Sequence, residues 1–524
     1  MDALSLEHED RGGLRNCHAL ALLPLSKKDQ SRHLVRVLEA AKQYWNWRVS
    51  VICEGLDGNA FTRLTSGGGQ VFPRPHLLKV MPWEYDEARC ASMEQRIGEA
   101  EIASGVPMGR VVMASAHNIG RAFNLSTRTL RAYPLVRLVL KDNKEPYRIA
   151  RRLFHFADEV LAATKPDIVF AFDWATPLNF SVWMIANQRG IPCFALRHCK
   201  INADRGFLTP DRVMLNRAAI ARGQAKRLAA APVSDAAKKH VQVFRERPST
   251  IRFIAIKWQS RMRRGFVRWH LITARVLVRQ FIDRFRGQDQ ALQEPPLRRI
   301  LRYYRTLFLT YWQQRYLRSF DEEELGKMKY IYFSLHKEAE LAKTFQTTLW
   351  HDQRNTIRVL ASMLPFGYRL LVREHRMNYG NRPTRSYREL LQLPNVIMLD
   401  PFDSQFKYLR HADLIVTENS SSGWEGLLMK RRVLMLAEAF YDGAGLAAKV
   451  RDPDLINRAI LECLSKPPVI DEEAHDHALG CMVDGELETT FPMNEEGMPE
   501  ALNQLATMVR GASAKPQTVT VTDT

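Results

Sequence analysis

The sequence has few cysteines and no apolar stretch long enough to span a membrane. Seven cysteines are scattered over 524 residues with no CxxC pair and no zinc-ligand spacing, which excludes a disulfide framework and a zinc finger. No segment approaches the ~20 apolar residues of a membrane-spanning helix. The first residues are acidic where a secretory signal is basic, so we expect no such signal. We therefore predict a cytoplasmic protein, either soluble or peripheral on the inner face of the membrane.

Acidic residues are also in deficit. There are 57 Asp and Glu against 76 Lys and Arg, which gives a formal charge of +19. Such an excess indicates an anionic partner, whether nucleic acid, an anionic membrane surface or a phosphorylated substrate. Hydrophobic residues make up 46% and charged residues 25% of the chain. This usage is typical of globular proteins and excludes a wholly disordered chain.

The pattern of short apolar runs predicts an α/β fold with two doubly wound parallel-sheet lobes. In the first lobe, residues 15–225, strands alternate with amphipathic helices, which indicates βαβ units. The expected strands are ALALLPL, WRVSVICEG, PDIVFAF and IPCFAL. In the second lobe, residues 329–510, we expect five strands with short helices between them: KYIYFSL, YRLLVRE, NVIML, DLIVTE and RVLMLAE. Residues 511–524 are predicted to form a disordered polar tail.

A basic, aromatic helical insertion, residues 226–328, separates the two lobes. Its central part, 252–318, holds sixteen Lys and Arg against three acids, a net charge of +13 interleaved with twelve aromatic residues. One interpretation is a solvated helical hairpin whose aromatics pack on a lobe. The other is an in-plane anchor on the anionic inner membrane surface. No recognition-module signature accompanies the charge, so we expect no nucleic acid partner.

Polar residues follow three strands of the second lobe. They are Ser334-Leu335-His336 with Glu340, then Arg373 to Arg376, then the run from Glu418 to Glu425. Ligands of parallel sheets collect at the carboxyl ends of strands, where helix N-termini present free N–H groups. Ser420, Ser421 and Ser422 at a helix start would suit a phosphate; the alternative is a simple N-cap, which one serine satisfies.

These segments resemble the bacterial capsule polysaccharide biosynthesis proteins. The similarity is carried in order by YIYFSLHKEAEL, LPFGYRLLVREHRMNYGNRP, LPNVIMLDP and ADLIVTENSSSGWEGLLMKRRVLML. That family is similar to Kdo- and sialic-acid-transferring enzymes of the GT-B fold, in which two Rossmann-like lobes bind a nucleotide sugar. The resemblance implies a CMP-activated donor and a glycan or glycolipid acceptor, with no further cofactor.

The resemblance also assigns roles. His375 would contact the cytidine monophosphate, the three serines 420–422 would hold its phosphate, and Glu425 would address the ribose or orient the loop. His336 and Glu340 would line the cleft. Arg373, at a strand end of the second lobe, and Arg197, whose charge could face the carboxylate of the acceptor or donor, are cleft-lining candidates from their own positions. Three positions depart from the family pattern: Arg376 and Ala339 replace prolines, and Gly426 replaces an alanine.

The acceptor side needs a carboxylate that takes the hydroxyl proton. Asp173, directly after PDIVFAF, is the candidate; the alternative is that it caps the next helix. Cytidylate leaves as a stable anion, and we expect no metal site. The sequence thus predicts a glycosyltransferase of capsular polysaccharide. Two alternatives stay open: a CDP-polyol phosphotransferase of the teichoic-acid type, and a non-catalytic capsule assembly or export partner.

Overall fold

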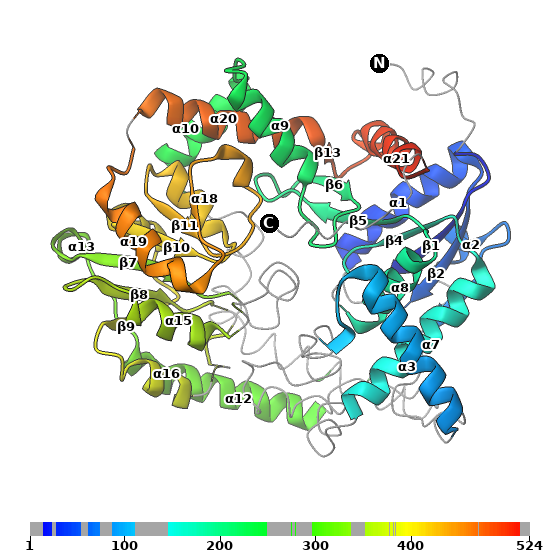
Figure 1. Ribbon diagram of the computed structural model, residues 1–524, viewed down its shortest axis with the longest axis horizontal. Helices are drawn as coiled ribbons and strands as arrows, with labels where there is room; N and C mark the ends of the chain where they lie inside the picture. Colours follow the sequence, from blue (N-terminus) through cyan, green and yellow to red (C-terminus); the bar gives the residue numbers. More distant parts are fainter. Residues whose placement is uncertain are drawn as a thin grey trace. The chain divides into compact units, whose positions relative to one another are not determined.

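The computed structural model describes residues 14–23, 28–53, 61–73, 86–109, 145–248, 274, 278, 296–336 and 350–513, except 175, 351, 377, 381, 383 and 470. The chain divides into two compact units, whose helices and strands are labelled in Figure 1. The first unit comprises residues 1–120, 142–217 and 489–524, and the second comprises residues 121–141 and 218–488.

The first unit is built on a seven-stranded sheet in the order β13-β6-β5-β4-β1-β2-β3. Strands β1 to β5 are parallel, and β6 and β13 add an antiparallel edge. The four predicted strands β1, β2, β4 and β5 are confirmed, whereas β3 lies where the sequence predicts no strand. All six residues of β1 are buried, as expected of a strand covered on both faces. The strands are β1 (His18–Leu23), β2 (Arg48–Cys53), β3 (Val71–Pro73), β4 (Ile168–Ala171), β5 (Cys193–His198), β6 (Arg205–Thr209) and β13 (Phe491–Pro492).

Helices cover this sheet, and one of them comes from the far end of the chain. They are α1 (Lys28–Trp45), α2 (Thr62–Thr65), α3 (Glu87–Ser104), α7 (Glu145–Thr164), α8 (Pro177–Gln188) and α21 (Met498–Ser513). Leu502 and Leu505 of α21 are buried in the same core as Trp47 and Phe170. The predicted boundary at residue 510 is therefore wrong, because the apolar face of α21 completes the first unit rather than the second.

The second unit contains a six-stranded parallel sheet in the order β12-β11-β10-β7-β8-β9. The strands are β7 (Tyr330–Ser334), β8 (Arg369–Arg373), β9 (Val396–Leu399), β10 (Leu414–Thr417), β11 (Val433–Met435) and β12 (Ala448–Lys449). The five predicted strands are confirmed. The sixth, β12, has two exposed residues and carries no apolar pattern that would predict it. Together the two sheets confirm the predicted fold class of two Rossmann-like lobes.

The helices between these strands are short, as predicted. They are α15 (Gln353–Ser362), α16 (Thr384–Leu390), α17 (Gln405–His411) and α18 (Ser421–Leu428). Helix α13 (Glu322–Lys327) precedes β7, and α19 (Ile456–Ser465) follows β12. Further helices of this unit are α9 (Arg217–Leu228), α10 (Asp235–Glu246), α12 (Pro296–Gln313) and α20 (Glu472–Thr489). Single turns of 3-10 helix, η4 (Gln314–Tyr316), η5 (Asp442–Ala444) and η6 (Pro453–Leu455), complete the set.

Helices α9 and α10 correct the predicted insertion 226–328. They do not form a separate body, because they pack on α20 within the second unit. Lys226 pairs with Asp484 at 3.1 Å, and Arg245 pairs with Asp476 at 2.5 Å. Hydrogen bonds from Ser234 and Lys226 outweigh burial and lower the pKa of the Asp484 carboxyl. Of the basic segment 252–318, residues 252–295 other than 274 and 278 lie outside the described residues.

Two further expectations concern the carboxyl-terminal tail and membrane-spanning helices. Helix α21 extends to Ser513, so the predicted tail begins later than residue 511, and residues 514–524 lie outside the described part. Among the residues that the structure describes, no helix combines the length and apolarity needed to cross a bilayer.

The contact between α9 and α20 generates the first prediction. A Cβ atom on Gly485 would lie 2.5 Å from Ala219 O and 2.8 Å from Gly223 N. Because backbone cannot yield as a side chain end can, we expect Gly485→Ala to destabilise the protein by about 1–3 kcal/mol. The matched control is Gly98→Ala on α3, where nothing lies within 4 Å and alanine should stabilise by up to about 1 kcal/mol. Calorimetric unfolding measures both; an unchanged midpoint for Gly485→Ala would contradict this packing.

Candidate functional site

The candidate site lies at the carboxyl edge of the second sheet, between β7 and β10. From β7 the chain runs to β8 and β9 on one side, whereas β10 leads to β11 and β12 on the other. Such a reversal of strand order is a topological switch point, where open parallel sheets bind their ligands. The first polar residues after β7 and β10 therefore lie where a ligand is expected.

Three serine hydroxyls meet at this switch point. Ser334 ends β7, and Ser420 and Ser422 follow β10. Ser334 Oγ lies 3.0 Å from Ser420 Oγ and 2.7 Å from Ser422 Oγ, and Ser420 and Ser422 are hydrogen-bonded to each other. The structure thus brings together two of the three predicted serines with a third hydroxyl from another strand.

The same serine run starts helix α18. Ser420 has extended backbone geometry, and its Oγ accepts a hydrogen bond from Ser422 N at 3.0 Å. Thr417 Oγ1 in turn accepts from Ser420 N at 2.9 Å. Ser420 is therefore the N-cap, and Ser421 is the first helical residue. The cap needs one serine, so Ser334 and Ser422 supply hydroxyls beyond what helix initiation requires.

Two glycines let α18 approach the sheet closely. A Cβ on Gly423 would lie 2.0 Å from the Tyr441 hydroxyl and 2.9 Å from Cγ2 of Thr417. A Cβ on Gly426 would lie 2.3 Å from Cδ1 of Ile415. The absence of side chains here brings the start of α18 against β10 and so to the switch point. Gly426, which departs from the alanine of the family pattern, makes room for the Ile415 side chain.

Glu425 lies in the interior, one turn into α18. Its side chain is 1% exposed, and Oε2 accepts a hydrogen bond from Gln405 Nε2 at 2.7 Å. Burial raises the pKa of this carboxyl to about 8, although Arg373 and the Ser421 hydroxyl act in the opposite direction. Of its two predicted roles, contact with the ribose or orientation of the loop, this buried geometry favours orientation.

Arg373, predicted to line the cleft, is tied to the chain between β9 and α17. It donates to Gln405 Oε1 at 3.0 Å and to the carbonyls of Pro401 and Asp403 at 2.9 and 3.0 Å. Arg376 donates through Nε to the same Pro401 carbonyl at 2.8 Å. Burial and the charge of Arg373 lower the pKa of Arg376. Two guanidinium groups therefore converge at the end of β8, where an anion would be stabilised.

A buried ion pair shapes the loop that carries His375. Glu374 and Arg382 are 0% and 2% exposed, with Arg382 Nε 2.5 Å from Glu374 Oε2. The Tyr387 hydroxyl donates to the same oxygen at 2.9 Å, and His375 N donates to Oε1 at 2.7 Å. The carboxylate of Glu374 therefore fixes the backbone of the predicted nucleotide-contacting histidine.

His336 follows β7 and is largely buried. Its backbone exchanges hydrogen bonds with the Gln353 side chain, with distances of 2.7 and 3.2 Å, and its carbonyl accepts from Asn378 Nδ2 at 3.1 Å. The His336 ring lies with Nε2 3.9 Å from Glu418 Oε2. Glu340, the other predicted cleft residue on this segment, lies outside the described residues.

Asp173 and Arg197 lie at the carboxyl ends of β4 and β5 in the first unit. Arg197 donates through a terminal guanidinium nitrogen to the Phe172 carbonyl at 3.2 Å, and its guanidinium carbon is 5.1 Å from the centre of the Phe172 ring. The N-cap of α8 is Thr176, whose hydroxyl accepts from Asn179 N. Asp173 is therefore not the side chain that caps this helix, which removes the alternative to its proposed role.

Two histidines accompany Asp173 at this edge. The rings of His33 and His198 meet edge to face at 6.3 Å, and His198 also lies 6.0 Å from the Phe172 ring. Burial lowers the pKa of His198, and the neighbouring His33, Arg197 and Lys200 act in the same direction. The lowered pKa favours the neutral form of the His198 imidazole.

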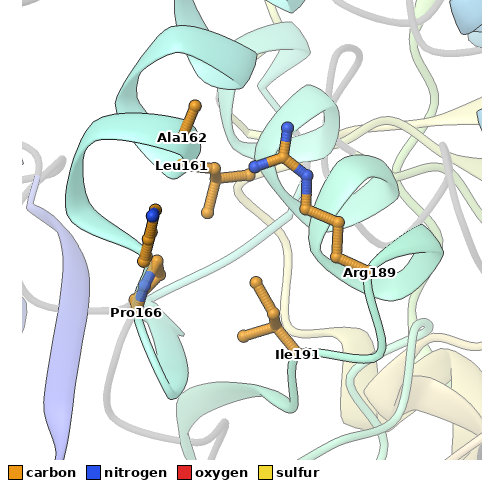
Figure 2. A pocket seen from close by; sticks show the side chains of 6 residues that line it. Leu161, Ala162, Pro166, Arg189 and Ile191 are labelled. Atoms are coloured by element: carbon orange, nitrogen blue, oxygen red, sulfur yellow. The ribbon is translucent and has the colours of Figure 1, made fainter.

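A hollow of about 420 Å³ lies elsewhere in the first unit, at the amino edge of the sheet, where α7 ends and β4 begins. Figure 2 shows five of its lining residues, Leu161, Ala162, Pro166, Arg189 and Ile191. Arg189 already pairs with Asp158 at 2.5 Å. Lys165 lines the hollow as well, and the hollow lies away from the strand ends that carry Asp173.

Several residues of the site escape prediction. Gln405, Gln353 and Tyr441 lie on separate helices and loops, and no local pattern relates them to the serines. Ser334 had a signal, since it is the last residue of a buried strand next to the serine-bearing strand. The role of Ser334 follows only from the adjacency of the two strands, which the sequence alone does not give.

Glu425 generates the second prediction. Because the native carboxyl has a pKa of about 8 and an unfolded one about 4.3, folding stability is lost as pH rises from about 4 to about 8. The full effect is of order 4–5 kcal/mol. We expect Glu425→Gln to flatten the decline in unfolding temperature between pH 6 and pH 9, and exposed Glu473→Gln to leave it unchanged. Parallel pH profiles for Glu425→Gln and the natural protein would contradict a protonated Glu425.

The chain is similar to several solved structures, three of which follow. The beta Kdo 2,7 transferase KpsC of Thermosulfurimonas dismutans is 12% identical over 68% of this chain and 89% of that one, with a TM-score of 0.33. A glycosyltransferase from Rickettsia africae is 9% identical over 95% and 99%, with a TM-score of 0.30. A UDP-GlcNAc 2-epimerase from Neisseria meningitidis is 11% identical over 90% and 99%, with a TM-score of 0.24. Similarities this weak say nothing of the activity of this chain.

The sequence families give a more specific result. No curated protein matches the chain. The family described as capsule polysaccharide biosynthesis protein matches residues 294–457, a segment that includes α12, all six strands of the second sheet and the serines at its switch point. The predicted resemblance is thereby confirmed: this segment is similar to the capsule polysaccharide biosynthesis proteins.

Proposed function

We propose that the protein is a glycosyltransferase of capsular polysaccharide biosynthesis that transfers a sugar acid from a CMP-activated donor to a glycan or lipid-linked acceptor. One observation carries the proposal. The hydroxyls of Ser334, Ser420 and Ser422 converge at the switch point of a Rossmann-like sheet, inside the segment that matches the family.

The serines would bind the phosphate of the donor. Each hydroxyl has one proton and rotates freely, so three hydroxyls now bonded to one another can turn their protons toward an anion. The N-terminus of α18 adds a partial positive charge and free N–H groups. His375, on the loop fixed by Glu374, would contact the cytidine monophosphate.

The arginines at the end of β8 would stabilise the leaving group. As the bond between the anomeric carbon and the phosphate oxygen breaks, negative charge develops on CMP, and nearby fixed cations lower the barrier. Arg373 and Arg376 meet at Pro401. Their charges would also suit the carboxylate of a sugar acid.

In the first unit, Asp173 would act as the general base. It would accept the proton of the acceptor hydroxyl while the acceptor oxygen bonds to the anomeric carbon. The protein would act peripherally at the cytoplasmic face of the membrane, where lipid-linked acceptors are reached.

A CDP-polyol phosphotransferase is the second candidate. It is favoured by Arg376, which stands in place of the proline of the family pattern and adds a second cation beside Arg373. Two guanidinium groups suit a donor with two phosphates better than one phosphate requires. CMP is the leaving group in both reactions. The two candidates differ in the group transferred, which is a sugar acid from a CMP-activated sugar in the first and a phosphoryl-polyol from a CDP-polyol in the second.

Nucleotide titration tests the donor site. We expect CMP to bind the natural protein by calorimetry, and Ser422→Ala, Ser334→Ala and His375→Ala each to weaken binding. A hydrogen bond to a charged group is worth about 1.5–3 kcal/mol, which predicts a loss of roughly 10- to 100-fold per serine. Ser362→Ala is the control, since that hydroxyl bonds only Val359 O of its own helix.

The same titration separates the alternatives. Tighter binding of CDP than of CMP would favour the phosphotransferase. A preference for UDP would indicate a UDP-activated donor instead of a CMP-activated one. If none of the three nucleotides binds, the transferase is contradicted and the non-catalytic assembly partner is favoured.

Asp173 gives a separate prediction. Loss of a general base typically slows the chemical step by about 10²- to 10⁴-fold, so we expect Asp173→Asn to reduce CMP release from a CMP-activated sugar acid by that factor. CMP affinity should stay unchanged, because Asp173 does not belong to the unit that holds the nucleotide. Asp167→Asn is the control at the opposite edge of the same sheet, where the carboxylate accepts from His18 N. An undiminished rate in Asp173→Asn would place the base elsewhere.

A further inference from the structure

Helix α12, Pro296–Gln313, is rich in arginine and in large apolar residues. Its sequence holds four arginines and no acid, and Arg315 follows in the next turn. At 1.5 Å per residue, its 18 residues span roughly 27 Å. The helix is too rich in arginine to cross a bilayer, but long enough to lie along one.

One face of α12 exposes large apolar side chains. The exposed fractions are 60% for Leu301, 42% for Tyr304, 62% for Phe308, 78% for Tyr311 and 43% for Trp312. Each residue after Leu301 follows an earlier one by three or four positions, so all five lie on one stripe of the helix. We call these five residues the aromatic stripe. Contiguous exposed apolar surface on a soluble protein indicates an interaction site.

The stripe is ordered at its carboxyl end. The rings of Phe308 and Trp312 stack with centres 6.1 Å apart and planes 15° from parallel. The guanidinium carbon of Arg315 lies 3.5 Å from the centre of the Trp312 ring. An aromatic surface bordered by a guanidinium group combines apolar contact with attraction to anions.

The opposite side of α12 is anchored to the loop after β8. Gln313 is fully buried; its Nε2 donates to Arg382 O at 2.7 Å, and its Oε1 accepts from Gly380 N at 3.2 Å. The Tyr379 hydroxyl donates to Thr310 O at 2.7 Å. The helix is thus held in a fixed rotation about its axis, with the aromatic stripe facing away from the loop that carries His375.

We propose that α12 binds in the plane of an anionic lipid bilayer, with the aromatic stripe at the acyl boundary and with Arg305 and Arg315 on the lipid phosphates. Aromatic and aliphatic side chains on one face and arginine on the flanks are the features of interfacial helices. The absence of any acid on the helix complements a negatively charged surface. Helix α12 would be the surface through which the protein takes its proposed peripheral location. This inference does not depend on the proposed reaction.

Vesicle flotation tests the proposal with the full chain. We expect capture by vesicles of phosphatidylcholine mixed with phosphatidylserine, weak capture by phosphatidylcholine alone, and release by salt. The variant Phe308→Ser/Tyr311→Ser/Trp312→Ser should lose at least roughly tenfold in vesicle affinity, since it removes three interfacial side chains. Phe366→Ser is the matched control, because Phe366 is a fully exposed phenylalanine of the same unit outside α12.

The outcomes separate docking from folding and from the reaction. The unfolding temperature and CMP titration of the triple variant report on the fold and the donor site, so a loss confined to vesicle binding supports the proposal. Undiminished capture of the triple variant would overturn it, and so would equal losses in Phe366→Ser. A lipid-free dimer that the triple variant abolishes would assign the stripe to a second copy of the chain instead.

Discussion

The close approach of α18 to β10 is the constraint on which the candidate site depends. Gly423 and Gly426 permit it, and two groups from other helices hold the far end of α18. The His475 ring lies 2.9 Å from Leu427 O, and Arg245 donates to Leu428 O at 2.8 Å. These carbonyls belong to the last turn, where no partner exists within the helix. Helices α10 and α20 thus fix α18 at its end, and the position of its first turn at the switch point follows.

Buried charge organises the rest of this edge. A buried ion pair contributes little net stability, because desolvation offsets the attraction, but its loss is costly and its geometry is specific. Glu374 and Arg382 hold the loop with His375, and the same loop binds Gln313 of α12. Glu425, through Gln405, connects α18 to Arg373 at the end of β8. Hydrogen bonds between these polar groups therefore link the ends of three separate strands.

The sequence allowed the sheets to be predicted more fully than the site. Buried parallel strands such as YIYFS and LIVT are short apolar runs bounded by polar residues, and that pattern is local. Strand order is not local: only the pairing of β7 with both β10 and β8 brings Ser334 to the serines. The same holds for α21, whose period indicates a helix but whose partner, α1, lies more than 450 residues earlier in the chain. Gln405 has no pattern at all, since its role exists only in the folded network.

The departures from the family pattern bear on whether the site is intact. A glycine in place of alanine at 426 could signal a loosened helix, yet Ile415 occupies the space that the methyl group would need. An arginine in place of proline at 376 frees a backbone N–H and removes a rigid φ angle. Its guanidinium compensates by binding Pro401 O, the carbonyl that Arg373 also holds. At both positions a new contact replaces the lost constraint.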